Sequence, residues 1–176
     1  MFLDPARIEH EAAVDDPPVA VAAAVRGWRE LPARSAELAA FASSVHADPT
    51  PLATALRSGP QCLLQGDWKV GNLGIGADGR TILLDWAFVG AGPPCWELCW
   101  YLALNRARLP VSKEDTIDSF RRGLQAAGVE TRGWFDEQLD LCMAGMMAAF
   151  GWEKALGDET ELRWWEERAR RGAARL

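Results

Sequence analysis

The sequence has few of the residues that build zinc sites. It contains only two histidines, His10 and His46, and none of its four cysteines forms a Cys-x-x-Cys pair. Structural zinc needs Cys and His at such short spacings, so we do not expect a zinc site. The cysteines lie in apolar stretches, which predicts reduced thiols packed in a core. They are Cys62, Cys95, Cys99 and Cys142.

The chain is also poor in positive charge and in long apolar runs. Its 19 Lys and Arg are outnumbered by 25 Asp and Glu, giving a net charge of -6. An acidic chain lacks the basic face that displaces counterions from nucleic acid, so nucleic acid is not an expected partner. No run approaches the roughly 20 apolar residues that cross a bilayer. The start, MFLDPARIEHEAAVDD, lacks the apolar stretch of a signal peptide. We therefore expect no membrane partner and a cytoplasmic location.

The pattern of apolar residues predicts an α+β fold that is mostly helical. The alanine-rich segment 19–45 has helical spacing, and Pro32 is expected to divide it into two helices. Further helices are predicted towards the C-terminus, and the extended segments fall between 61 and 86. The predicted later helices are 96–105, 112–127, one or two helices within 134–156, and 159–171.

Residues 65–86, QGDWKVGNLGIGADGRTILLDW, contain a predicted hairpin. Residues 72–75 and 81–86 are its strands, and Asp78-Gly79 supplies the positive backbone angle of a tight turn. Residues 61–64 are predicted to form a short buried strand before it. The stretch VGAGPP after it is expected to be a loop without regular structure, because of its glycines and prolines.

Three glycines of the hairpin, Gly74, Gly76 and Gly79, match the pattern G-x-G-x-x-G. A dinucleotide-binding loop needs a helix that opens at the last glycine, so that the helix N-terminus meets the pyrophosphate. Here the strand-like segment TILLDW follows instead. The glycines therefore indicate a hairpin turn and not a phosphate loop.

Three polar residues of the same stretch form the stronger pattern. Asn72 follows Asp67 by five residues, and Asp85 lies at the end of the second predicted strand. Singly, each is compatible with a turn, cap or strand-end residue. Together they provide what phosphoryl transfer from ATP needs. One carboxylate orients the attacking hydroxyl, while an amide oxygen and a second carboxylate hold Mg²⁺.

The segment GDWKVGN followed by ILLDW resembles the catalytic loop and metal-binding strand of the aminoglycoside phosphotransferase and choline kinase-like family. This family is related to the protein kinases. The resemblance implies the C-terminal lobe of a protein-kinase-like fold, with a small β-hairpin carrying the catalytic loop. It also implies that Asp67 is the catalytic aspartate and that Asn72 and Asp85 hold magnesium.

The resemblance extends to three supporting residues. Lys69 stands two positions after the aspartate, where protein kinases often carry a lysine that faces the transferred phosphate. Glu97, in GAGPPCWELCWYLAL, stands where the family ties a buried helix to the catalytic loop. Gln65 replaces the family's histidine, whose role is architectural, and glutamine can also donate and accept hydrogen bonds.

The implied activity is transfer of the ATP γ-phosphate, with Mg²⁺, to a hydroxyl of a small molecule. An aminoglycoside-, amino alcohol- or sugar-like acceptor would fit. By resemblance, 1–176 is a single C-terminal lobe. Residues 1–58 are a helical lead-in, 59–105 hold the catalytic loop, the metal hairpin and a buried helix, and 106–176 form a helical acceptor-side subdomain.

The family's N-terminal lobe has no counterpart in this sequence. No strand–glycine loop–strand pattern and no strand lysine precede Gln61. We therefore expect weak or no catalysis by this chain alone, and either a separate N-terminal lobe or self-association as its protein partner. Two alternatives stay open: a non-catalytic binding or interaction protein that retains the fold, and a metal-assisted hydrolase using the same carboxylates.

Overall fold

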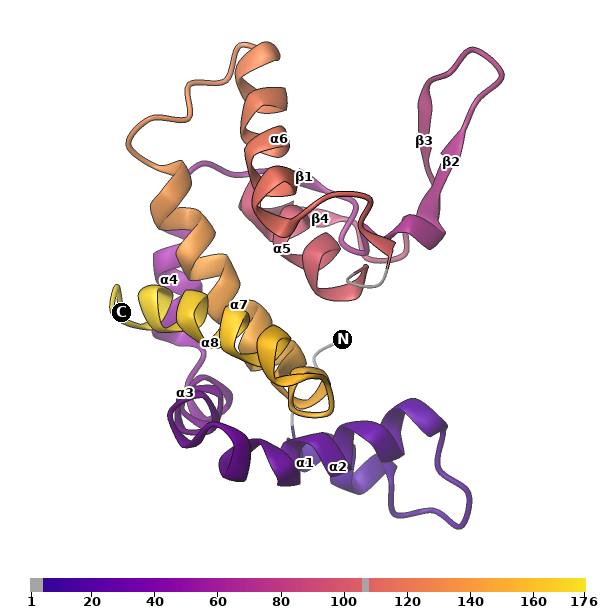
Figure 1. Ribbon diagram of the computed structural model, residues 1–176, viewed down its shortest axis with the longest axis vertical. Helices are drawn as coiled ribbons and strands as arrows, with labels where there is room; N and C mark the ends of the chain where they lie inside the picture. The colour runs from indigo at the N-terminus through magenta and orange to yellow at the C-terminus, as the bar shows by residue number, and fades with distance from the viewer. Residues whose placement is uncertain (1–4, 106–107) are drawn as a thin grey trace. The chain divides into compact units, whose positions relative to one another are not determined.

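The computed structural model describes residues 5–105 and 108–176. Within these ranges helices predominate and the strands form two small antiparallel sheets, which confirms the mostly helical α+β prediction (Figure 1). The helices are α1 (Pro5–Glu11), α2 (Val19–Arg34), α3 (Ala36–Ala47), α4 (Thr50–Ser58), α5 (Pro94–Leu104), α6 (Lys113–Ala126), α7 (Phe135–Ala155) and α8 (Glu159–Ala173). The strands are β1 (Cys62–Leu64), β2 (Leu73–Ile75), β3 (Thr81–Leu83) and β4 (Gly90–Gly92), and a 3-10 turn, η1 (Val70–Asn72), precedes β2.

The chain divides into two compact units. The terminal unit comprises the chain up to Thr54 and from Met143 onward, and the central unit is Ala55–Cys142. The prediction that the chain is a single lobe stays a prediction. None of the helices in the described part of the chain is long and apolar enough to cross a membrane.

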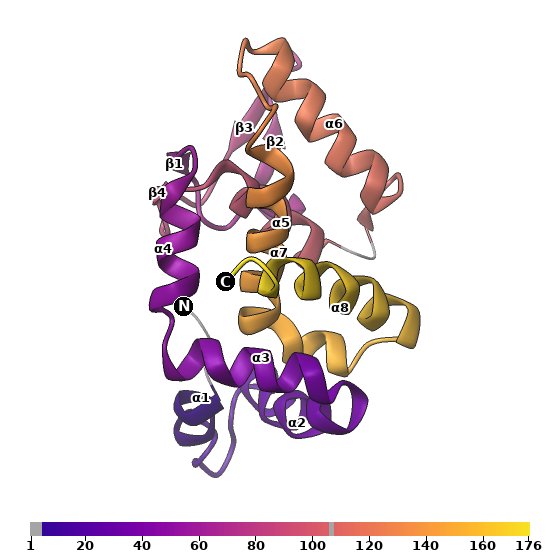
Figure 2. The same ribbon diagram turned by 90° about the vertical axis from the view of Figure 1, so that its left-hand side faces the viewer.

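In the terminal unit, α3 follows α2 directly, and the chain turns sharply between them at a serine cap (Figure 2). The prediction that Pro32 separates them was wrong, because Pro32 lies inside α2, which continues to Arg34. The break falls at Ser35, whose hydroxyl accepts from the backbone N–H of Leu38 over 3.2 Å. Proline deprives a helix of only one donor, whereas an N-cap serine satisfies a donor of the following helix and fixes where that helix starts.

The guanidinium of Arg34 closes the C-terminal end of α7 within the same unit. It donates to the backbone carbonyls of Ala155 and Gly157 over 2.6 and 3.1 Å, and it also contacts the carboxylate of Glu159. The last carbonyls of a helix have no partner within the helix, so this side chain supplies them with donors.

The central unit contains a sheet that the sequence pattern did not predict. Strand β4 pairs antiparallel with β1, with Leu64 opposite Gly90 and Cys62 opposite Gly92. The stretch VGAGPP is therefore not an irregular loop, and a Cβ at Gly92 would lie only 2.5 Å from a methyl group of Leu64. Glycine is unfavourable in an isolated strand, but here it leaves room for the Leu64 side chain of the neighbouring strand.

Strand β1 is less buried than predicted. Only Leu64 is buried, whereas Cys62 and Leu63 are exposed, so the expectation of a core position fails for one of the four thiols. Among the described residues β1 has β4 as its single neighbouring strand, so its other edge is unpaired. The other cysteines are buried and free, as predicted, and burial raises the pKa of Cys95 and Cys142.

The predicted hairpin is present as β2 and β3, with Leu73 opposite Leu83 and Ile75 opposite Thr81. Gly79 has a φ of +79°, as the Asp-Gly turn requires, and Gly76 N–H donates to the carbonyl of Arg80 over 2.8 Å. The second strand is shorter than expected and ends at Leu83, so Asp85 lies beyond it.

The helices after the hairpin follow the prediction closely. Helix α5 is buried, and α6 begins after Ser112, whose hydroxyl accepts from the backbone N–H of Asp115 over 3.0 Å. Gly128, with a φ of +83°, follows the end of α6. Residues 135–155 form one continuous helix, α7.

Candidate active site

The predicted site residues lie in the loop of residues 65–72, which connects β1 to β2 and is here called the Asp67 loop. Gln65, Asp67 and Asn72 are buried in it, with exposed fractions of 4, 6 and 7%. Polar side chains are rarely buried to this extent unless they are hydrogen-bonded. Their hydrogen bonds therefore define the site.

The carboxylate of Asp67 accepts from three side chains. Lys69 Nζ and Asn72 Nδ2 donate to its Oδ2 over 2.5 and 2.9 Å, and the indole Nε1 of Trp100 donates to its Oδ1 over 3.0 Å. Burial raises the pKa of Asp67, but the hydrogen bonds from Lys69, Trp100 and Asn72 outweigh it, so the pKa lies below its ordinary value. Asp67 is thus held as a carboxylate.

The side chain of Gln65 links the loop to the segment after the hairpin. Its Oε1 accepts from the backbone N–H of Asp67 over 2.9 Å. Its Nε2 donates to the carbonyls of Leu84 and Asp85 over 2.8 and 2.6 Å. The glutamine thus uses both its acceptor and its donor, and it joins the backbones of the two aspartates.

Asn72 and Asp85 are brought together by the hairpin. The backbone N–H of Leu84 donates to the carbonyl of Asn72 over 2.8 Å, and Asp85 follows directly. Asn72 Nδ2 donates to the carbonyl as well as to the carboxylate of Asp67, both over 2.9 Å. The amide nitrogen is therefore committed to Asp67, and the amide oxygen is the Asn72 atom that remains for a ligand.

Asp85 differs from its neighbours because it is exposed and has a φ of +55°, the one described non-glycine residue in the left-handed region. Aspartate tolerates this conformation better than most residues, at some cost in backbone strain. The conformation turns the chain out of β3.

Glu97, on α5, contacts the loop from the other side. Its Oε1 accepts from the backbone N–H of Gly66 over 2.9 Å, whereas its Oε2 is buried and has no hydrogen-bond partner among the described residues. Burial raises the pKa of Glu97 more than the hydrogen bonds from the backbones of Gly66 and Gln65 lower it. Gly66 has a φ of +85°, and a Cβ there would lie 2.2 Å from the carbonyl oxygen of Phe88, so no other residue fits.

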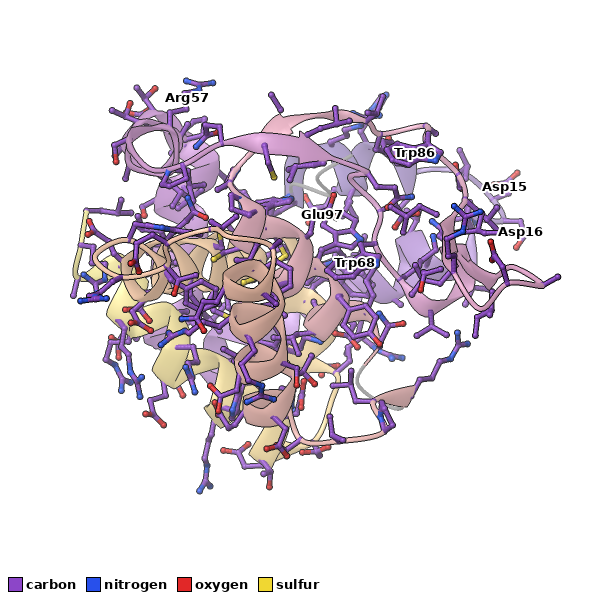
Figure 3. The ribbon with its side chains drawn as sticks, turned by 90° about the horizontal axis from the view of Figure 1, so that it is seen from above. Asp15, Asp16, Arg57, Trp68, Trp86 and Glu97 are labelled. Atoms are coloured by element: carbon purple, nitrogen blue, oxygen red, sulfur yellow. The ribbon has the colours of Figure 1, made fainter. Side chains whose placement is uncertain are left out.

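Figure 3 labels Trp68 and Glu97, which come from the Asp67 loop and from α5, and Trp86, which is exposed beyond β3. The ring of Trp68 packs against the rings of Tyr101 and Phe120, with centroids 5.4 and 6.0 Å away. The aromatic contacts anchor the loop to α5 and α6.

Two residues of the site were missed in the sequence. Trp100 donates to Asp67, and Asn105 Oδ1 accepts from the backbone N–H of Val70 over 2.9 Å. Trp100 stands one turn after Glu97 on the same face of α5, and Asn105 is the residue that ends this helix. The spacing of one helical turn from Glu97 was the feature of the sequence that could have identified Trp100.

The donor set fits a hard cation. Carboxylate and amide oxygens are the ligands that Mg²⁺ prefers, and Asp85 and Asn72 offer one of each. Within residues 5–105 and 108–176, no group of three or more His, Cys, Asp or Glu side chains is placed to hold a metal. A cation here would therefore complete its shell with water or with a ligand's phosphates.

A buried aspartate, an amide five residues later and a second aspartate after a hairpin are typical of kinase-type phosphotransferases. The sequence profile of the phosphotransferase enzyme family matches residues 4–138, well over half of the chain. The chain belongs to this family, which confirms the resemblance. No curated protein and no solved structure matches the chain significantly.

Proposed function

We propose that the chain is a kinase-type phosphotransferase lobe whose reaction transfers the ATP γ-phosphate to a hydroxyl of a small molecule. The observation that carries the proposal is the hydrogen-bonded frame around Asp67. Asn72 bonds its carboxylate directly, and Gln65 ties its backbone to that of Asp85. Family membership supports phosphotransfer in general. The small-molecule acceptor is part of the proposal.

In the proposed reaction, Asp67 orients the attacking hydroxyl and accepts its proton as the new O–P bond forms, while the bond from the γ-phosphorus to the ADP oxygen breaks and ADP leaves. Lys69 is the proposed phosphate contact. Its ammonium lies 2.5 Å from Asp67 Oδ2, and its side chain is 39% exposed. It can therefore reach a ligand while it still borders the carboxylate. Gln65 and Glu97 support the loop.

Asn72 and Asp85 are the proposed Mg²⁺ ligands. A magnesium ion held by these two side chains would offset the negative charge of the donor phosphates. Asn72 contributes its amide oxygen, because its nitrogen is held by Asp67. The exposed position of Asp85 leaves its carboxylate accessible to a metal–nucleotide complex.

We also propose that the fold is the C-terminal lobe of a protein-kinase-like fold, with the partner lobe or a second copy covering the hairpin. Apolar side chains beside Asp85 support this, because contiguous exposed apolar surface usually marks an interface. Leu84, Trp86, Phe88 and Val89 are each between 45 and 50% exposed, and Ile75 is 82% exposed.

The first test compares Asp67→Asn and Asp85→Asn with the unchanged chain. We expect ATP with Mg²⁺ to raise the melting temperature of the chain and of Asp67→Asn, but not of Asp85→Asn. Asp78→Asn, in the exposed hairpin turn, is the matched control and should behave like the unchanged chain. Mg²⁺–ATP stabilisation that survives in Asp85→Asn would contradict the metal assignment.

The second test is phosphate transfer from labelled ATP to a panel of amino alcohols, aminoglycosides and sugars. Transfer that disappears in Asp67→Asn supports the proposed reaction. The exposed apolar surface favours one other function, a non-catalytic binding protein that retains the fold. Nucleotide binding without transfer to any acceptor, also after addition of a candidate partner lobe, would support that function instead.

A further inference from the structure

The indole of Trp100 contacts the oxygen of Asp67 that the Asp67 loop itself leaves free. Lys69 and Asn72 both donate to Oδ2, and Trp100 alone among these three side chains donates to Oδ1. Trp100 comes from α5, so this hydrogen bond joins two parts of the chain that are 33 residues apart.

The three donors leave one defined place for a further donor. A carboxylate has about four lone-pair sites, two on each oxygen. Lys69 and Asn72 occupy both sites of Oδ2, whereas Trp100 occupies one site of Oδ1. A hydroxyl that donates to Asp67 must therefore meet Oδ1.

The chemical nature of the indole makes this contact different from an ordinary polar neighbour. Indole Nε1 is a donor only, so it cannot exchange roles with the carboxylate or compete for the hydroxyl proton. The side-chain torsion of aspartate that rotates the carboxylate is broad, and donors on both oxygens hold its plane. Asp67 is 6% exposed, so little water is available to replace the indole.

We infer that Trp100 is a positioning residue: its indole N–H fixes the Asp67 carboxylate and leaves a single site on Oδ1 for the acceptor hydroxyl. This inference rests on the proposed function for its catalytic meaning. The hydrogen bond itself can be tested without any activity.

The first experiment records the indole N–H resonances of the full chain labelled with ¹⁵N-tryptophan. The Trp100 resonance is assigned by its loss in Trp100→Phe. In Asp67→Ala we expect it to move upfield and its solvent exchange to accelerate at least about tenfold, because a charge-assisted hydrogen bond is lost. The Trp134 indole, which donates to the carbonyl of Glu130, is the internal control and should not change. An unchanged Trp100 resonance in Asp67→Ala overturns the inference, and so does a Trp134 change of equal size.

The second experiment measures transfer kinetics of Trp100→Phe, which keeps an aromatic ring and loses the donor. We expect kcat to fall about tenfold with little change in KM for ATP, because the variant disturbs Asp67 and not nucleotide binding. Trp164→Phe, a half-buried tryptophan of the terminal unit, should keep the original kcat. An unchanged kcat in Trp100→Phe overturns the positioning role.

The two experiments separate the inference from the proposed function. A Trp100 resonance that responds to Asp67→Ala in a chain that transfers phosphate to nothing, also after addition of a candidate partner lobe, supports the hydrogen bond and counts against the proposed function alone. Transfer that needs Asp67 but not Trp100 counts against the inference alone. If Trp100→Phe does not fold, the Trp100 indole resonance is assigned by sequential NMR methods instead. Its comparison between the unchanged chain and Asp67→Ala then still tests the hydrogen bond.

Discussion

The side-chain amide of Gln65 donates to the backbone carbonyl of Asp85 over 2.6 Å, across 20 residues of chain. The same side chain accepts from the backbone N–H of Asp67. A glutamine keeps one donor end and one acceptor end at every pH, because it does not titrate. A neutral histidine could offer one of each, but a protonated one could only donate. The link between the two aspartates is therefore insensitive to pH in this chain.

Replacing Gln65 by histidine should make this link depend on pH. Below the ordinary histidine pKa of about 6.5 the imidazolium has no acceptor for the Asp67 N–H, so a buried donor is left unsatisfied. We expect Gln65→His to lose about 1 kcal/mol of stability relative to the unchanged chain between pH 7.5 and 5.5, because a single histidine kept neutral by the fold loses at most about 1.4 kcal/mol for each pH unit below its ordinary pKa. Urea unfolding at the two pH values measures this.

Gln65→Ala serves as the control, because it removes the link at both pH values and adds no titrating group. It should be destabilised to a similar extent at pH 7.5 and 5.5. If the stabilities of the unchanged chain and of Gln65→His change with pH in parallel, the Asp67 N–H does not need the side chain at position 65 as its hydrogen-bond acceptor.

Glu97 should make the stability of the chain fall as the pH rises. Its pKa is raised in the folded state, so the folded chain binds its proton more tightly than the unfolded chain does. The stability that this provides is complete below the unfolded pKa and is lost as the pH rises through the folded pKa. Glu97→Gln keeps an acceptor for Gly66 N–H without titrating, and its stability relative to the chain should increase over that interval.

Glu97→Ala tests the other half of this account. It leaves the backbone N–H of Gly66 without its acceptor, and because neither alanine nor glutamine titrates, Glu97→Ala should be about 1–3 kcal/mol less stable than Glu97→Gln at any pH. Urea midpoints of Glu97→Gln and Glu97→Ala, measured from mildly acidic to neutral pH, test both expectations. If the difference in stability between Glu97→Gln and the unchanged chain is constant over this pH range, the Glu97 carboxyl does not change its protonation on folding.

A buried ion pair in the terminal unit should show strong coupling. Lys154 is fully buried, and its Nζ lies 2.5 Å from Oε2 of Glu153, whose side chain is partly exposed, and 3.8 Å from Oε1 of Glu161, which is buried and also accepts from the indole of Trp165 over 2.7 Å. Lys154→Met should cost about 3–5 kcal/mol, because it leaves a buried carboxylate without its cation. Adding Glu161→Gln should recover part of the loss, and a double-mutant cycle by urea unfolding measures it.

Arg163→Met is a matched control for this cycle. Arg163 pairs with Glu159 on the same helix, but both side chains are largely exposed. Its removal should leave the urea midpoint almost unchanged, because solvent screens such pairs. Additive effects of Lys154→Met and Glu161→Gln would mean that the two charges do not stabilise each other.

The sequence predicted the hairpin, its Asp-Gly turn and the helices after it, because local patterns determine these elements. It did not predict β4, because Gly90–Gly92 is a strand only through its pairing with β1. The candidate site shows the same division. Asp67, Asn72 and Asp85 stood out by their spacing along the chain, whereas the contact of Trp100 with Asp67 depends on how α5 packs against the loop. The only trace of such a tertiary contact in the sequence is the helical spacing between the residues of α5 that face the loop.

Gly27, in α2, should not tolerate a methyl group. A Cβ there would lie 2.1 Å from the backbone carbonyl oxygen of Trp152 in α7, and backbone cannot move aside as a flexible side chain can. Alanine has the higher helix propensity by about 1 kcal/mol, so an effect of propensity alone would be stabilising. Because α2 and α7 must separate, we expect Gly27→Ala to be destabilised by about 1–3 kcal/mol or more.

Gly123, in α6, has nothing within 4 Å of its Cβ position, and Gly123→Ala should gain about 0.5–1 kcal/mol. Thermal and urea unfolding of the two variants compare the same substitution with opposite expected signs. A stabilised Gly27→Ala would mean that α2 and α7 do not approach each other this closely.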